Sequence, residues 1–253
     1  MIDYVQVHMG DDDGIEFFGG TTDIRHVVVS GAADDSLDWD EGWHGRAQFV
    51  IVHQHADESD NGIEADNLDS NNDSTPRSQP TIYNISLIGP NDELGEQRGA
   101  VLRRGTWGTL RNAIFMGFGK ESVDLRDEAT IAGIDSGVLA VESSIFFDIG
   151  SAGDEWFADE PTDGSDDDDD AGFVELDYFT ATERSNSFGE DPMLVDPYNT
   201  TAPDFSPAEG SPVSQKAASP VDDGFFDTSA QFIGAIEPGG EDWTAGWTNF
   251  ASE

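Results

Sequence analysis

Hydrophobic and polar residues alternate in three short segments near the N-terminus, at residues 13–18, 35–40 and 61–66. Their starting points, 13, 35 and 61, lie 22 and 26 residues apart, which is about one turn of a parallel β-solenoid. Side chains on a strand point alternately to opposite faces, so each segment has an apolar face and an acidic face. The apolar faces are Ile15 with Phe17, Leu37 with Trp39, and Ile63 with Ala65. The pattern therefore predicts parallel strands stacked in successive coils around an apolar interior.

Similar apolar runs bounded by Gly and Asp continue along most of the chain, as is typical of buried parallel strands. They occupy residues 4–7, 24–30, 47–53, 81–89, 99–103, 110–116, 122–126 and 139–147. The first coils contain no helical periodicity. We therefore expect an all-β fold, a right-handed parallel β-helix over residues 1–185, from which loops 66–79 and 151–171 project. Residues 186–253 are rich in Pro, Gly and Ser and are expected to form an irregular segment that packs on the helix and covers the edge of the last coils.

The composition narrows the possible partners. The chain has 253 residues, with 53 Asp and Glu against 11 Lys and Arg, which gives a net charge of −42. Such an acid excess, combined with 16 Phe and 6 Trp, indicates a folded protein adapted to high salt rather than a disordered acidic tail. It argues against nucleic acid and anionic lipid as partners, because there is no basic patch. The absence of Cys excludes thiol catalysis and disulfides.

The outward faces of the three segments form a ladder of carboxylates. Neighbouring parallel strands lie about 4.8 Å apart, so carboxylates in one column are held within about 5 Å of each other. Crowded carboxylates make a hard-cation site, for which calcium is the expected ion. The candidate metal ligands are Asp13, Glu16, Asp35, Asp38, Glu64 and Asp66. Later coils carry Arg103 and Arg126 instead, so the ladder is confined to about three coils.

The same ladder supports two other interpretations. Carboxylates about 5 Å apart match the spacing of retaining glycosidases, and crowding raises at least one pKa, so Glu16, Asp38 and Glu64 are candidate catalytic residues. In a protein with 53 acidic residues, the ladder is also consistent with ordinary solvated surface. The motifs of polygalacturonases are not present in full, and the strand residues His53 and His55 are expected to face solvent rather than to bind zinc.

The sequence resembles a family of secreted bacterial proteins described as right-handed parallel β-helix surface proteins or lipoproteins. The resemblance rests on residues 4–8, 12–20, 34–43 and 61–66, and on the C-terminal stretches 210–213, 224–227, 234–235 and 243–250. The family is mostly uncharacterised and is common in Bacteroidetes and in marine or halophilic relatives. The resemblance implies the fold and a secreted or cell-surface location, but no activity.

The chain begins inside an alternating strand, at Ile2–His8, and residues 1–4 do not resemble a signal peptide. No apolar run is long enough to be a transmembrane segment. We therefore expect the C-terminal portion of a longer exported protein, with a monomer slightly favoured. The predicted function is binding of glycan (polysaccharide) or divalent cations without turnover. The alternative is a polysaccharide-active hydrolase or lyase.

Overall fold

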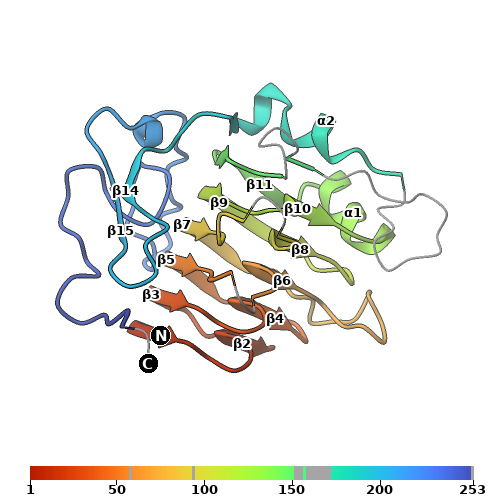
Figure 1. Cartoon of the computed structure of the whole chain (residues 1–253). Helices are drawn as coiled ribbons and strands as arrows, with labels where there is room; N and C mark the ends of the chain where they lie inside the picture. Colours follow the sequence, from red (N-terminus) through yellow and green to blue (C-terminus); the bar gives the residue numbers. More distant parts are fainter. Residues whose placement is uncertain (57–58, 93–94, 151–155, 158–171, 252–253) are drawn as a thin grey trace.

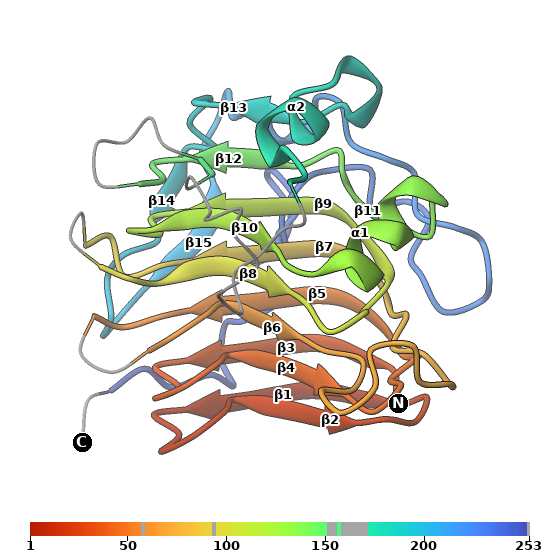
Figure 2. The same ribbon diagram turned by 90° about the vertical axis from the view of Figure 1, so that its right-hand side faces the viewer.

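The strands of successive coils stack in register and form a parallel β-helix in the computed structural model (Figures 1 and 2). The structure describes residues 1–253 except 57–58, 93–94, 151–155, 158–171 and 252–253. One sheet, here called sheet A, contains β1 (Ile2–His8), β3 (Ile24–Ser30), β5 (Arg46–His53), β7 (Thr81–Ile88), β9 (Gly108–Met116), β11 (Leu139–Glu142), β12 (Ile145–Phe147) and β13 (Ser187–Phe188). Sheet B contains β2 (Ile15–Phe18), β4 (Leu37–Asp40), β6 (Ile63–Ala65), β8 (Arg98–Leu102) and β10 (Glu121–Leu125). The predicted all-β, parallel β-helix fold is confirmed.

The interior is filled by the apolar faces that the alternation predicts. Leu37 pairs with Ile15 on one side and with Ile63 on the other, and the side chains of Leu37 and Ile63 are buried. Trp43 is fully buried and stacks on Phe17 with ring centroids 4.4 Å apart. Trp39 donates its indole N–H to the Thr106 hydroxyl, at 3.0 Å. These aromatic residues therefore belong to the core.

A column of residues with positive φ crosses sheet A at equivalent positions of successive coils. Its members are Tyr4, His26, Phe49, Asn84, Asn112 and Ser143, with φ between 48° and 59°. This left-handed backbone conformation turns each long strand in its middle. In the last of these coils the turn separates β11 from β12, which pair with the two halves of β9. The column therefore bends sheet A along one line.

The C-terminal segment packs on the outer face of sheet A, and it reaches the first coil rather than only the edge of the last coils. Outward apolar residues such as Val28, Ile51 and Ile114 form a second core with Phe205 and Ile233 from this segment. The segment contacts β1 directly, because Asn249 N donates to Gln6 Oε1 at 2.7 Å. The reason is that apolar residues line this outer face through several coils and need cover. Within the segment, β14 (Leu194–Asp196) pairs antiparallel with β15 (Asp204–Pro207).

Two short helices were not expected from the alternation. Helix α1 (Glu128–Asp135) begins after Asp127, whose carboxylate accepts hydrogen bonds from the backbone N–H groups of Ala129 and Thr130, at 2.9 and 3.0 Å. This is an N-cap interaction, which satisfies donors that a helix start leaves free. Helix α2 (Glu175–Phe179) and the 3₁₀ turns Thr182–Arg184 and Pro212–Ser214 follow later in the chain.

The predicted loop 66–79 connects β6 to β7 and is held by Asn67. The Asn67 side chain donates to the carbonyl oxygens of Asn72 and Ser74 and accepts from the backbone N–H of Ser78. The predicted loop 151–171 lies outside the described residues, apart from 156–157. Over the described part of the chain, every helix is too short or too polar to cross a lipid bilayer.

Candidate functional site

Glu16, Asp38 and Glu64 lie in one column on the outer face of sheet B. Each residue pairs with the next across β2, β4 and β6, so the predicted stacking is present in the register. The column of carboxylates ends at Val101 of β8, which is the register partner of Glu64. Glu16 is exposed, Glu64 is half-buried, and Asp38 is only 9% exposed. The middle carboxylate is therefore largely removed from water by its neighbours.

Burial and crowding favour the protonated form of Asp38. Burial is the main cause, the negative charge of Glu64 is the next, and together with further carboxylates they raise the pKa of Asp38 to about 9. The pKa of Glu16 is also raised, mainly by burial and then by Asp13, although a hydrogen bond from Asp38 opposes this shift. Asp38 can thus hold a proton at neutral pH and share it with the adjacent Glu16.

Asp13 and Asp35 lie in the turns before β2 and β4 and connect one coil to the next. The Asp13 carboxylate accepts a hydrogen bond from the backbone N–H of Asp35 at 3.1 Å, and Asp35 accepts one from Asn61 N–H at 2.8 Å. Burial, followed by the charge of Glu64, raises the pKa of Asp35 to about 8. Each of these two carboxylates therefore has a structural role, because it ties its own coil to the next one through a backbone hydrogen bond.

The predicted metal ligands are distributed over more than one cluster. Asp13, Glu16 and Asp38 can each place one carboxylate oxygen within 4.8 Å of the others. Asp35 forms a similar group with Asp34 and Asp60, which the sequence interpretation did not include. A third such group contains Asp12, Asp13 and Asp34. Runs of adjacent Asp residues in the turns were the available signal for these additional residues.

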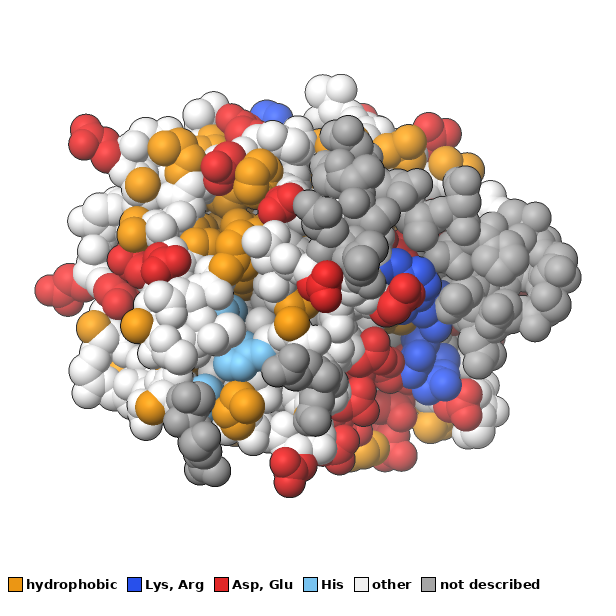
Figure 3. Space-filling view, viewed as in Figure 1, with side chains coloured by type: hydrophobic (Ala, Val, Ile, Leu, Met, Phe, Trp, Pro, Cys, Tyr) orange, Lys and Arg blue, Asp and Glu red, His pale blue; other side chains and the backbone are white. Residues whose placement is uncertain are grey.

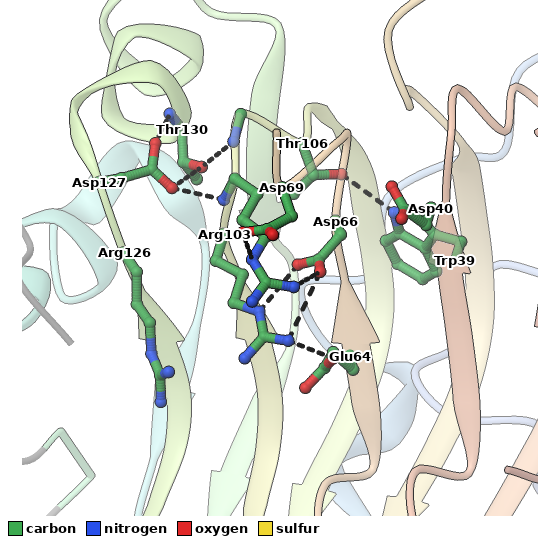
Figure 4. A network of polar contacts seen from close by, with 12 residues as sticks. Trp39, Asp40, Glu64, Asp66, Asp69, Arg103, Thr106, Arg126, Asp127 and Thr130 are labelled. Carbon is green, nitrogen blue, oxygen red and sulfur yellow. Dashed lines mark hydrogen bonds and ion pairs between the residues drawn. The ribbon is translucent and has the colours of Figure 1, made fainter. Parts of the chain in front are cut away.

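Glu64 and Asp66, the other two predicted ligands, are engaged by arginine (Figure 4). Arg103 forms an ion pair with Glu64 and donates its Nε–H to Asp66 at 2.9 Å. Arg104 donates to the second oxygen of Asp66 at 2.6 Å, and it also pairs with Asp69. These two carboxylates are therefore already neutralised by the protein, unlike Asp38.

Beyond Glu64, the outer face of sheet B becomes mixed in charge. Arg98 of β8 pairs with Glu121 at 2.9 Å and with Asp124 at 3.0 Å, and Arg126 binds Asp124 at 2.8 Å. Figure 3 shows acidic side chains gathered beside a cluster of basic side chains at the lower right of this view. The face therefore combines an acidic half, over β2, β4 and β6, with a half in which arginines and carboxylates pair.

The histidine pair considered from the sequence lies on the other sheet, with His53 at the end of β5 and His55 just after it. His53 is 1% exposed and packs edge-on against Phe205, so the expectation that it faces solvent is wrong. The C-terminal segment, whose position the strand pattern does not reveal, provides this cover. Burial lowers the pKa of His53 to about 3. Within the described residues, the sets of three or more acidic or histidine side chains that lie close enough to share a cation contain only Asp and Glu.

A family model described as a pectate-lyase-like β-helix domain matches residues 1–187. This range covers both sheets of the β-helix and the whole carboxylate column. No curated protein sequence and no solved structure matches the chain significantly.

Proposed function

Because this chain belongs to the pectate-lyase-like β-helix domain family, we propose that it binds polysaccharide on the outer face of sheet B, through a divalent cation and without cleaving the polymer. The observation that carries the proposal is the buried Asp38 carboxyl, which stands in register between Glu16 and Glu64. The net charge of −42 supports action in high salt, as expected for an exported, salt-adapted protein.

The donor set at Asp38 fits a hard cation. Calcium takes six to eight oxygen ligands, mostly carboxylates and carbonyls, and tolerates irregular geometry. Asp13, Glu16 and Asp38 supply carboxylate oxygens that lie within 4.8 Å of one another. Among the residues that the structure describes, Asp38 has no arginine partner of the kind that Glu64 has. A bound calcium ion would neutralise this crowded group and leave coordination positions for sugar oxygens.

The negative charge on the outer face of sheet B predicts how polysaccharide binding depends on the divalent cation. A polysaccharide that carries carboxylates would be repelled by Glu16 and the other ionised carboxylates around Asp38 unless a cation lies between the polymer and this face. Arg103 gives limited help, because it is already paired with Glu64 and Asp66. Binding of an acidic polysaccharide should therefore require the cation, whereas binding of a neutral one should not.

The test measures calcium binding and polysaccharide binding together. At 10 mM Ca²⁺ in high salt we expect a rise in the melting temperature of about 5 °C, as a ligand at about 100 times its Kd gives. Mg²⁺ at equal ionic strength should give a smaller rise. Polygalacturonate should bind with Ca²⁺ and not with EDTA. Asp38→Asn should lose both effects, while the exposed Asp222→Asn retains them. Equal calcium responses of the two variants would contradict the proposal.

A polysaccharide hydrolase is the second candidate, and the hydrogen bond between Asp38 and Glu16 favours it. A carboxyl group protonated at neutral pH can serve as a general acid, with Glu16 or Glu64 as the second carboxylate. Release of reducing sugar from a polysaccharide, abolished by Asp38→Asn with the fold retained, would establish this activity. Binding without release of sugar would instead support the first proposal.

A further inference from the structure

A cavity of about 340 Å³ lies over the outer face of sheet A, the sheet opposite the carboxylate column, between the bend in sheet A and the C-terminal segment. Sheet A contributes His26 and Phe49 from the positive-φ column, and the C-terminal segment contributes Phe232 and Trp243. This volume is within the range of small-molecule sites in proteins. The cavity exists because the bend turns these two side chains outward, where the segment passes over them.

Aromatic rings form the walls of this cavity and hold one another in place. His26 stacks on Phe49 at 5.1 Å, and Phe49 stacks on Phe232 at 6.3 Å. The Trp243 ring meets His26 edge to face at 5.2 Å and stacks with Trp247 at 6.2 Å. These contacts fix the rings before any ligand arrives, which reduces the entropy cost of binding.

The indole and hydroxyl donors in the lining, and one ring nitrogen of His26, already have partners inside the protein. The Trp243 indole N–H donates to the carbonyl oxygen of Ala235 at 2.8 Å. The Ser229 hydroxyl donates to Asp227 at 2.6 Å, and His26 Nδ1 lies 2.8 Å from an Asp3 oxygen. The groups left for a ligand are therefore mainly carboxylate oxygens and aromatic rings, together with Nε2 of His26.

The charge of the lining is negative. Asp227, Glu237 and Glu241 line the cavity, and all three are exposed at its rim. Hydrogen bonds from Ser229, and then the nearby charge of Arg25, lower the pKa of Asp227, so this carboxylate is ionised at neutral pH. Arg25 itself lies over the Phe225 ring, at 4.8 Å, and is not part of the lining.

We propose that this cavity binds a small organic cation, with an alkylated ammonium group held against the wall formed by Phe49, Phe232 and Trp243 and facing the carboxylates of Glu237 and Glu241. A cation gains from the negative faces of aromatic rings, and it needs no hydrogen-bond donor from the protein. The site is separate from the polysaccharide face and does not depend on its function.

The experiment is calorimetric titration of the full chain with choline and with its neutral isostere, in which a carbon atom replaces the nitrogen. Ionic strength is kept constant with sodium chloride. We expect saturable binding of choline and at least about fivefold weaker binding of the isostere, as cation–π attraction gives. Absence of choline binding, or equal binding of the two compounds, would overturn the proposal.

Variants separate this site from a general effect of charge. The pair Glu237→Gln and Glu241→Gln leaves the shape of the rim intact and should weaken choline binding about fivefold or more. Glu209→Gln, at another exposed glutamate, should leave it unchanged. Trp243→Leu should also weaken binding, with circular dichroism used to verify the fold. Asp38→Asn should leave choline binding unchanged. A failure of the polysaccharide proposal can therefore be told apart from a failure of the choline proposal. A matching loss in Glu209→Gln would refute the assignment.

Discussion

At the scale of residues, Asp38 illustrates how neighbours decide the chemistry of a side chain. Its outward direction follows from the alternation in β4, yet its carboxyl is buried because Glu16 and Glu64 stack on either side of it. At neutral pH, the folded protein therefore keeps a proton on Asp38. The unfolded chain has already lost this proton, because the ordinary pKa of the group is 3.8. This difference links the stability of the protein to pH.

The sign of this linkage gives the first prediction. The contribution of Asp38 is fully present below pH 4 and is lost as pH rises toward about 9, so in EDTA the free energy of unfolding should fall from pH 5 to pH 8. Asp38→Asn, which mimics the protonated carboxyl, should reduce the slope by up to about 1.4 kcal/mol per pH unit. A smaller slope should remain from Asp35.

Urea unfolding at the two pH values is the appropriate measurement, with Asp222→Asn as the control. Asp38→Asn should be more stable than the wild type at pH 8 without metal. If it is instead less stable at pH 8 and equally pH-dependent, Asp38 is ionised in the folded protein and the interpretation of the column is wrong.

At the scale of elements, the bend in sheet A depends on residues in a left-handed backbone conformation. Asn84 in β7 has φ of 55° and is fully buried. Its amide donates to the carbonyl oxygens of Phe232 and Ala230, at 2.6 and 3.3 Å, and accepts from Gln48 at 3.0 Å. The residue therefore both permits the bend and attaches the C-terminal segment to the sheet.

Two substitutions at Asn84 should separate these roles. Asn84→Ala loses the hydrogen bonds and puts a residue that disfavours the left-handed conformation in place of one that tolerates it, so we expect a loss of about 3 kcal/mol. Asn84→Gly loses the same bonds without the backbone strain and should be about 1 kcal/mol more stable than Asn84→Ala. Chemical denaturation measures both. If Asn84→Ala is instead more stable than Asn84→Gly, which is the usual order within a strand, the left-handed backbone at residue 84 adds no strain.

At the scale of the whole molecule, the β-helix carries a large excess of acidic side chains, and some of their carboxylates are buried. Since only 11 basic residues oppose 53 acidic ones, the folded state carries strong self-repulsion in dilute buffer. Some arginines neutralise buried or half-buried carboxylates, as Arg103 between Glu64 and Asp66 illustrates. The remaining repulsion has to be screened by solvent ions.

We therefore expect the melting temperature to rise steeply between 0.1 and 2 M NaCl, because the screening length falls from about 10 Å to below about 3 Å. Scanning calorimetry at constant pH measures this rise. An equal rise with sucrose, which is excluded from surfaces but carries no charge, would argue against screening as the cause. Arg103→Met should be destabilised more in low salt than in high salt.

The sequence by itself determined the coils and the direction of their side chains. Alternation is a local property, since each strand residue must point to one face or the other, and repeated spacing then forces the strands into register. Residues 15–18, 24–30 and 37–40 could thus be predicted as strands, and Glu16, Asp38 and Glu64 as one outward column. Helix α1 was missed because it is short and its only sequence signal is a capping Asp, which is weak compared with the alternation of the strands.

Only the tertiary structure decided what surrounds these side chains. The pairing of Arg103 with Glu64 and Asp66 joins residues 39 and 37 positions apart, and the C-terminal segment meets the first coil across 243 residues. Such contacts depend on how distant coils and loops close on each other, which no local pattern encodes. The burial of Asp38 and His53, the division of the predicted ligands, and the aromatic cavity all follow from these long-range contacts.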